Sequence, residues 1–219
     1  MEEKKHITPF NVSKSQRGDL VGYLNKAILD KYPETKPKSL LTKTNILKNI
    51  CTEDTEYLLP EVCAGFIRTI ANKSEVELTP KLWTPHVIII EPDTISVTRE
   101  AKEVEKAVEG LVLEEVKVIV HQIYAKHKRI DSQIQELLQV DKAKKVLNVV
   151  VCTPNRLTKL SELKAVDYTQ LKCLIIDCTK NEKDQTIFDY KETRNDTIEL
   201  IGKFILKNAV KNKLKIYFH

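Results

Sequence analysis

From residue 86 onward, short apolar runs alternate with amphipathic segments, and this alternation constrains the fold more than any other feature. The run at 87–90 is continuous and β-branched, which is typical of a strand buried on both faces. Comparable runs lie at 116–120, 146–152, 171–177 and 213–218. The segments between them are long enough for helices. The sequence therefore predicts an α/β fold around a parallel sheet of five or more strands.

Apolar residues at helical spacing support this interpretation. In the segment 96–110, Val97, Ala101, Val104 and Val108 are spaced four, three and four residues apart. Similar spacing predicts further helices at 129–140 and 193–208, and a short one from Pro154.

The first 85 residues have a different pattern, which predicts a helical extension. We expect helices at 13–32 and 59–71 and a possible short helix at 39–50. Val62, Phe66 and Ile70 are the expected buried stripe of the helix at 59–71. We therefore expect the chain to consist of an N-terminal helical extension at 1–85 and a sheet domain at 86–219.

Composition narrows the classes of partner. Lys and Arg number 36 against 31 Asp and Glu, a net charge of +5 that permits contact with nucleic acid but also fits a solvated lysine-rich surface. The sequence has no apolar run of about 18 residues, and its charged start does not resemble a signal peptide, so we expect no membrane partner. The five cysteines and five histidines lack metal-ligand spacing, so we expect no metal site.

Thr153-Pro154-Asn155-Arg156 follows an apolar strand and is the best candidate for a binding site. Threonine can cap a helix through its hydroxyl, and proline suits the first helical turn. The free N–H groups of that turn and the Arg156 guanidinium would together favour a phosphate. The alternative is that Thr-Pro simply begins a helix.

A basic segment, Lys126-His127-Lys128, follows the predicted strand at 116–120. The carboxyl ends of parallel strands meet at one edge of a sheet, so this segment is expected beside Thr153. Its cations could contact RNA backbone, although a solvated basic turn would have the same composition.

Asp177 ends the strand at 171–177, where a phosphate-hydrolysing fold places its metal-binding carboxylate. Such a site also needs a Gly-x4-Gly-Lys-Ser/Thr loop, and none of the five glycines is followed by that pattern. No carboxylate follows Asp177 to position a water. We therefore interpret Asp177 as the remnant of a nucleotide site, with a loop-capping role as the alternative, and expect no catalytic residue and no cofactor.

These segments resemble the first RecA-like domain of DEAD-box RNA helicases, and more closely the CMS family of 90S pre-ribosome (small-subunit processome) components. The likeness rests on the strand and Thr-Pro-x-Arg unit at 146–157, on 171–177, and on 117–138. Asn155 stands where the helicases have glycine. The resemblance implies a degenerate RecA-like three-layer sandwich.

The resemblance also implies a function. We expect a non-catalytic ribosome-biogenesis factor in the nucleus and nucleolus that binds pre-rRNA or snoRNA and neighbouring processome proteins, with no small-molecule substrate. The expected RNA contacts are Thr153, Asn155, Arg156, Lys126, His127 and Lys128. Arg156→Ala is expected to lower RNA affinity without lowering thermal stability. A protein-only scaffold and, less favoured, an atypical ATPase are the alternatives.

Overall fold

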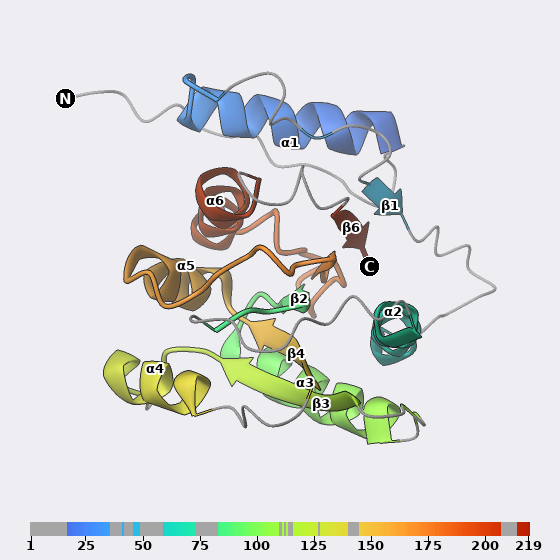
Figure 1. Ribbon diagram of the computed structural model, residues 1–219. Helices are drawn as coiled ribbons and strands as arrows, with labels where there is room; N and C mark the ends of the chain where they lie inside the picture. The colour runs from blue at the N-terminus through green and yellow to red at the C-terminus, as the bar shows by residue number, and fades with distance from the viewer. Residues whose placement is uncertain are drawn as a thin grey trace.

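Six parallel strands form one sheet, and helices cover both of its faces (Figure 1). The structure is a computed structural model that describes residues 17–35, 41, 46–48, 59–72, 83–109, 111, 113, 116–126, 128–139, 145–206 and 214–219. The strands are β1 (Ile46–Lys48), β2 (Val87–Ile90), β3 (Val116–Ile123), β4 (Lys145–Cys152), β5 (Cys173–Ile176) and β6 (Lys215–Phe218). Their order is β1-β6-β5-β2-β4-β3, with β2 inside the sheet and β3 at one edge.

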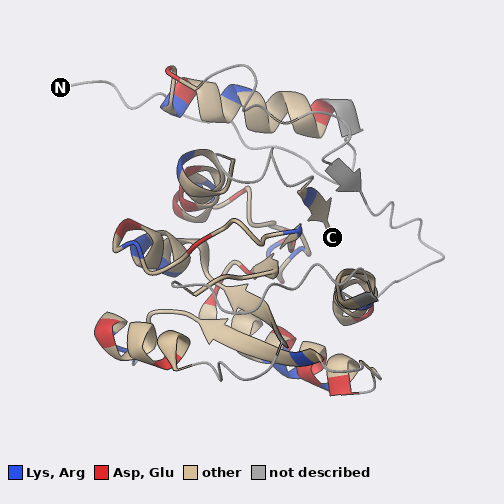
Figure 2. Cartoon of the chain, viewed as in Figure 1, with Lys and Arg blue, Asp and Glu red and all other residues tan. Residues whose placement is uncertain are grey.

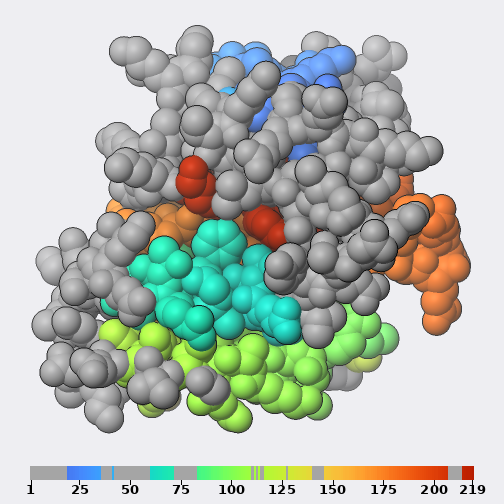
Figure 3. Space-filling view, turned by 90° about the vertical axis from the view of Figure 1, so that its right-hand side faces the viewer, coloured from blue at the N-terminus to red at the C-terminus, as the bar shows by residue number. Residues whose placement is uncertain are grey.

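The helices divide between the two faces of the sheet. One face is covered by α1 (Arg17–Lys31), α4 (Ile130–Leu138), α5 (Pro154–Glu162) and α6 (Lys191–Glu199), which continues into the π-helical turn η2 (Leu200–Ile205). The other face is covered by α2 (Leu59–Asn72) and α3 (Thr94–Glu109). Figure 3 shows α2 (teal) on this face, and α2 packs against α3. None of the described helices is both long and apolar enough to cross a membrane.

Two separate cores result from the alternation of side chains along each strand. Ile88 and Ile90 of β2 face the helices α1, α5 and α6, while Val87 and Ile89 face α2 and α3. All four are fully buried. A continuous β-branched run is therefore required here, because both faces of β2 exclude water.

The predicted parallel sheet between two helical layers is confirmed, with one added strand. Residues 46–48 form β1, which pairs with β6 through Ile46 and Ile216, so the helix expected at 39–50 is wrong where the structure describes it. Pairing with the open edge of β6 satisfies the backbone of these residues, a tertiary contact that local spacing does not reveal. In α2 the fully buried positions are Cys63 and Ile67 rather than Val62 and Phe66.

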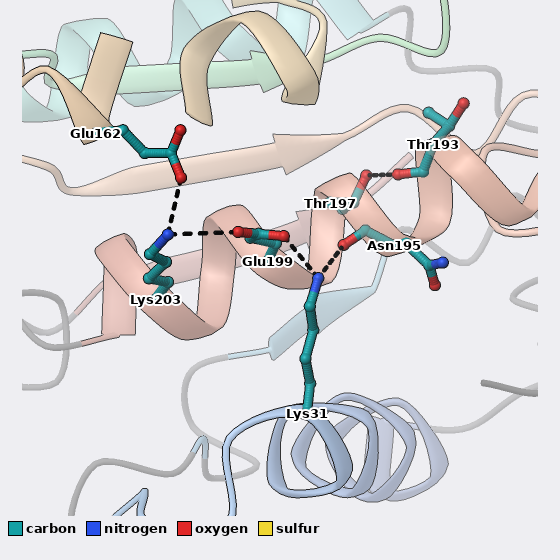
Figure 4. A network of polar contacts seen from close by, with 7 residues as sticks. All are labelled: Lys31, Glu162, Thr193, Asn195, Thr197, Glu199 and Lys203. Atoms are coloured by element: carbon teal, nitrogen blue, oxygen red, sulfur yellow. Dashed lines mark hydrogen bonds and ion pairs between the residues drawn. The ribbon is translucent and has the colours of Figure 1, made fainter. Parts of the chain in front are cut away.

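Polar contacts attach α1 to α6 (Figure 4). Lys31 Nζ lies 2.7 Å from Glu199 Oε2, and Lys203 Nζ lies 2.8 Å from Glu162 Oε1 and 3.5 Å from Glu199 Oε1. Gly202 allows the close approach of Tyr32, since a Cβ at Gly202 would lie 3.1 Å from the Tyr32 ring.

The helices α1 and α2 and the strand β1 all pack on the same sheet as the later elements. The predicted boundary between two domains at residues 85/86 stays a prediction.

Candidate nucleic-acid interface

The predicted site residues lie at the carboxyl edge of the sheet. Thr153 follows β4, and its backbone N–H donates to the carbonyl of Ile123 at the end of β3 over 3.0 Å. Asp177 follows β5, and its N–H donates to the carbonyl of Ile90 at the end of β2 over 3.0 Å. These bonds bring the strand ends together at the edge where open α/β sheets bind ligands.

Arg156 lies in the first turn of α5, with its guanidinium buried. The residue is 7 % exposed. Its Nε donates to Gln133 Oε1 over 2.8 Å, and its Nη2 donates to the backbone carbonyl of Lys128 over 2.8 Å. The side chain therefore joins α5 to α4 and to the basic segment. A direct contact of Arg156 with RNA phosphate stays a prediction.

Arg156→Ala is now expected to lower the free energy of unfolding, in contrast to the expectation from the sequence. Two hydrogen bonds from a charged donor are lost and the buried Gln133 amide oxygen loses its partner, a cost of about 2–3 kcal/mol. Urea titration measures this change, with Lys159→Ala, an exposed cation of the same helix, as the control. If both variants unfold as the wild type does, the guanidinium has no structural role.

The start of α5 differs from the expectation in one respect. Thr153 has an extended backbone (φ −82°, ψ 138°) and Pro154 begins the helix, as predicted. The Thr153 hydroxyl makes no capping hydrogen bond, so that part of the prediction is wrong. Asn155 is exposed, and its side chain hydrogen-bonds Asp196 of α6. Contacts of Thr153 and Asn155 with phosphate stay predictions.

The basic segment follows β3. Lys126 is exposed, and His127 lies outside the described residues. Lys128 Nζ lies 3.8 Å from Glu136 Oε2 and 5.7 Å from the centroid of the Tyr124 ring. An exposed ion pair of this length contributes little, so the Lys128 cation can exchange Glu136 for another anion.

A cleft of about 690 Å³ lies between the basic segment and the N-terminal half of α3. It is lined by Thr94, Ile95, Thr98, Arg99, Lys102, Glu103, Tyr124, Lys126 and Lys128. Four of these residues are cations, and the carboxylate of Glu103 lies 2.8 Å from Lys106 Nζ. Both signs of charge occur along α3 (Figure 2), so its sequence does not single out Arg99 and Lys102. Packing of α3 against β3 brings them beside the basic segment.

Sequence reasoning also missed Glu91, which directly follows β2. The residue is 0 % exposed. Burial, together with the nearby charges of Asp177 and Glu100, raises the pKa of Glu91 to about 10. In the ionised state its oxygens have no donor among the described residues, and a proton on Glu91 supplies the donor for a hydrogen bond with Asp177. A lone carboxylate directly after an apolar run was the available signal in the sequence.

Asp177 is 6 % exposed and engaged by groups of this chain. Its Oδ1 accepts from the Thr179 backbone N–H over 2.9 Å and from the Thr179 hydroxyl over 2.5 Å, and His219 Nδ1 lies 3.7 Å away. Burial would raise the pKa of Asp177, but the nearby His219 and the hydrogen bonds from Thr179 outweigh it and hold the pKa below its usual range. Among the described residues, no three His, Cys, Asp or Glu side chains are grouped to hold a metal ion.

Comparison with known proteins gives one family match. The sequence profile of the family described as the U3-containing 90S pre-ribosomal complex subunit (CMS1) matches residues 41–219, more than half of the chain. No curated protein matches the chain.

Solved structures are similar in fold. One is a DEAD box protein from the hyperthermophile Methanococcus jannaschii, with 20 % identity, a TM-score of 0.41, and coverage of 88 % of this chain and 41 % of that one. Another is a Saccharomyces cerevisiae Dbp5 variant bound to Nup159, a Gle1 variant, IP6 and ADP, with 14 % identity, a TM-score of 0.43, and coverage of 89 % and 44 %. This chain thus spans less than half the length of either. The α/β class with a parallel sheet, predicted from the sequence, is confirmed by the strand order.

Proposed function

Because the chain belongs to the CMS1 family of U3-containing 90S pre-ribosomal complex subunits, we propose that it is a non-catalytic assembly factor that binds RNA backbone. Family membership makes it a component of the 90S pre-ribosome. The RNA is proposed to be pre-rRNA or snoRNA, and neighbouring small-subunit processome proteins are the other partners. The nucleolus is the proposed place of action.

The cleft at the carboxyl edge is the observation that carries this proposal. Arg99 and Lys102 line one wall, and Lys126 and Lys128 line the other. Cations placed this way attract phosphates of any nucleotide sequence, so binding should be tolerant of sequence and weakened by salt. Thr153, Asn155 and Arg156 are proposed to extend the contact at the start of α5, with Arg156 also holding the Lys128 backbone.

The absence of catalysis is supported by the segment that follows β1. Residues 49–58 connect β1 to α2, and their sequence contains no glycine but three carboxylates, Glu53, Asp54 and Glu56. A triphosphate loop instead needs glycine N–H groups and a lysine to hold negative charge. Asp177, which would hold the metal ion, already accepts two hydrogen bonds from Thr179 through its Oδ1.

Charge reversal in the cleft tests the RNA contact. Lys102→Glu and Lys126→Glu are each expected to weaken binding of a single-stranded RNA about tenfold and to reduce the slope of log affinity against log salt by about one. Fluorescence anisotropy over a range of salt concentrations measures both. Lys26→Glu, on the exposed side of α1, carries the same charge change outside the cleft. If all three variants bind equally well, the cleft is not the RNA site.

A protein-only scaffold is the second candidate function. Exposed apolar side chains favour it, since Leu138 and Leu163 are 49 % and 54 % exposed. Crosslinking in purified pre-ribosomes separates the two, because a scaffold gives protein adducts and none to RNA near the cleft. The third hypothesis, an atypical ATPase, requires that the protein bind ATP, which calorimetry would detect.

A further inference from the structure

We propose that the cleft holds one unpaired nucleobase of the bound RNA, stacked on the ring of Tyr124. This inference deepens the proposed function and rests on it. The charged residues of the cleft account for phosphate binding. Two large apolar side chains, Tyr124 and Ile95, line the same cleft and have no part in phosphate binding.

The size and lining of the cleft fit a ligand with an apolar part as large as a nucleobase. A volume of about 690 Å³ exceeds what a phosphate group alone would fill and lies in the range of small-molecule sites. Tyr124 comes directly after β3 and lines one wall, and Ile95 of α3 lines the other. A base that enters between them would contact an aromatic face and an aliphatic side chain.

Ile95 has no evident role in the fold. It is 77 % exposed, the highest value among the exposed large apolar side chains in the described part of the chain. Asp93 already caps the start of α3 through its Oδ1, which accepts from the N–H groups of Ile95 and Ser96 over 2.7 and 2.9 Å. The helix therefore begins without help from the Ile95 side chain, whose apolar surface is left for a ligand.

Charge surrounds this apolar pair in a way that suits a nucleotide strand. Lys128 Nζ lies over the Tyr124 ring, 5.7 Å from its centroid, so a base stacked on that face would replace this cation–π contact and keep the cation at its edge. Arg99 and Lys102 are three residues apart and therefore lie on one side of α3. The base between the walls and the phosphates at the cations would be parts of one strand. Bases in a duplex already stack on each other, so only an unpaired base can enter.

The proposed ligand is a nucleobase with its adjacent phosphates, supplied by an RNA strand. The test compares two oligomers with the same backbone length, a uridine 12-mer and a 12-mer whose central residues are abasic. Each is titrated against wild type, Tyr124→Leu, Tyr124→Phe and Ile95→Ser by fluorescence anisotropy. Uridine monophosphate is added as a competitor in a separate series, which distinguishes a strand from a free nucleotide.

The wild type should bind the uridine oligomer about tenfold tighter than the abasic one. Tyr124→Leu should abolish that preference, so that the two oligomers bind it with equal affinity, whereas Tyr124→Phe retains the preference. Ile95→Ser should reduce the preference for the uridine oligomer. Because the Ile95 side chain is exposed, this variant tests the proposal even if the Tyr124 variants fold poorly.

Equal binding of the two oligomers by the wild type, or a preference that persists in Tyr124→Leu and Ile95→Ser, overturns the stacking proposal. In that case Lys126→Glu still reports on the proposed function, because loss of abasic binding in that variant shows that the phosphate contact is real. Competition by micromolar uridine monophosphate would instead assign the cleft to a free nucleotide. Failure of the wild type to bind either oligomer overturns both proposals.

Discussion

Glu91→Gln is expected to stabilise the protein by about 2–4 kcal/mol at pH 8 and to remove most of its loss of stability in alkali. The pKa of Glu91 in the folded state is about 10, against an ordinary value of 4.5. The folded state therefore keeps a proton that the unfolded state releases over this range. Stability from this group is complete below about pH 4.5 and falls as pH rises towards 10. Glutamine is neutral at every pH, and its amide can donate to Asp177 as the protonated acid does.

Urea titrations at intervals of one pH unit from 5 to 9 measure this effect. The wild type should lose stability with rising pH by up to about 1.4 kcal/mol per unit, and Glu91→Gln should lose less. Glu105→Gln, which removes an exposed carboxylate of α3, is the control and should follow the wild type. Parallel curves for the wild type and Glu91→Gln would mean that Glu91 is ionised in the folded protein.

Acid is expected to destabilise the protein through His86, which precedes β2 at the opposite edge of the sheet. His86 is 3 % exposed, and its Nδ1 accepts from the backbone N–H of Asn148 over 3.1 Å. Burial, helped by the nearby charge of Lys172, lowers the pKa of His86 from 6.5 to about 4. The unfolded state therefore binds more protons at His86 between these values, and the contribution of His86 to stability falls as pH falls through this window, by about 3 kcal/mol in total.

His86→Gln should remove this contribution, so its stability relative to the wild type should rise as pH falls. A glutamine carbonyl can still accept from Asn148, but it does not titrate. His121, whose pKa burial also lowers despite its hydrogen bond with Asn148, contributes the remainder in the same direction. Urea titrations from pH 4 to 7 measure the change. If the stability of His86→Gln changed in parallel with that of the wild type, the pH dependence would belong to His121 or to the carboxylates.

The two groups oppose each other between about pH 4.5 and 6.5, where Glu91 favours folding at lower pH and His86 favours it at higher pH. The stability of the wild type should therefore change less in this window than that of either variant. Glu91→Gln should gain stability as pH rises through the window, and His86→Gln should lose it. These opposite slopes are a sharper test than the size of either effect.

The sequence predicted the parts of the fold that depend on local pattern. A continuous β-branched run identified β2, and apolar runs identified β4 and β5. Helical spacing identified α2 and α3, because residues that face a dry core recur with the period of the helix. The pattern failed at β1, whose three residues are a strand because β6 offers an open edge. It also failed at Arg156, since position at a helix start says nothing about Gln133 and the Lys128 carbonyl, which lie 23 and 28 residues away.

Some residues of the candidate site could likewise be placed from the sequence, and others could not. Thr153 and Lys126 could be placed at one edge because parallel strands end together, and Asp177 could be recognised at the end of its strand. The cleft could not be foreseen, because it exists only where α3 packs beside the segment after β3. The nearness of Glu91 to Asp177 could not be foreseen either, because β2 and β5 are neighbours in the sheet but not in the chain.

By itself the sequence determined the layered α/β class, most of the element boundaries and the family, because each of these follows from residue order over short distances. The tertiary structure alone decided which charged side chains face solvent, which carboxyl group keeps a proton and where the cleft lies. Those properties depend on desolvation and on distances between side chains, and both are set when remote segments pack together.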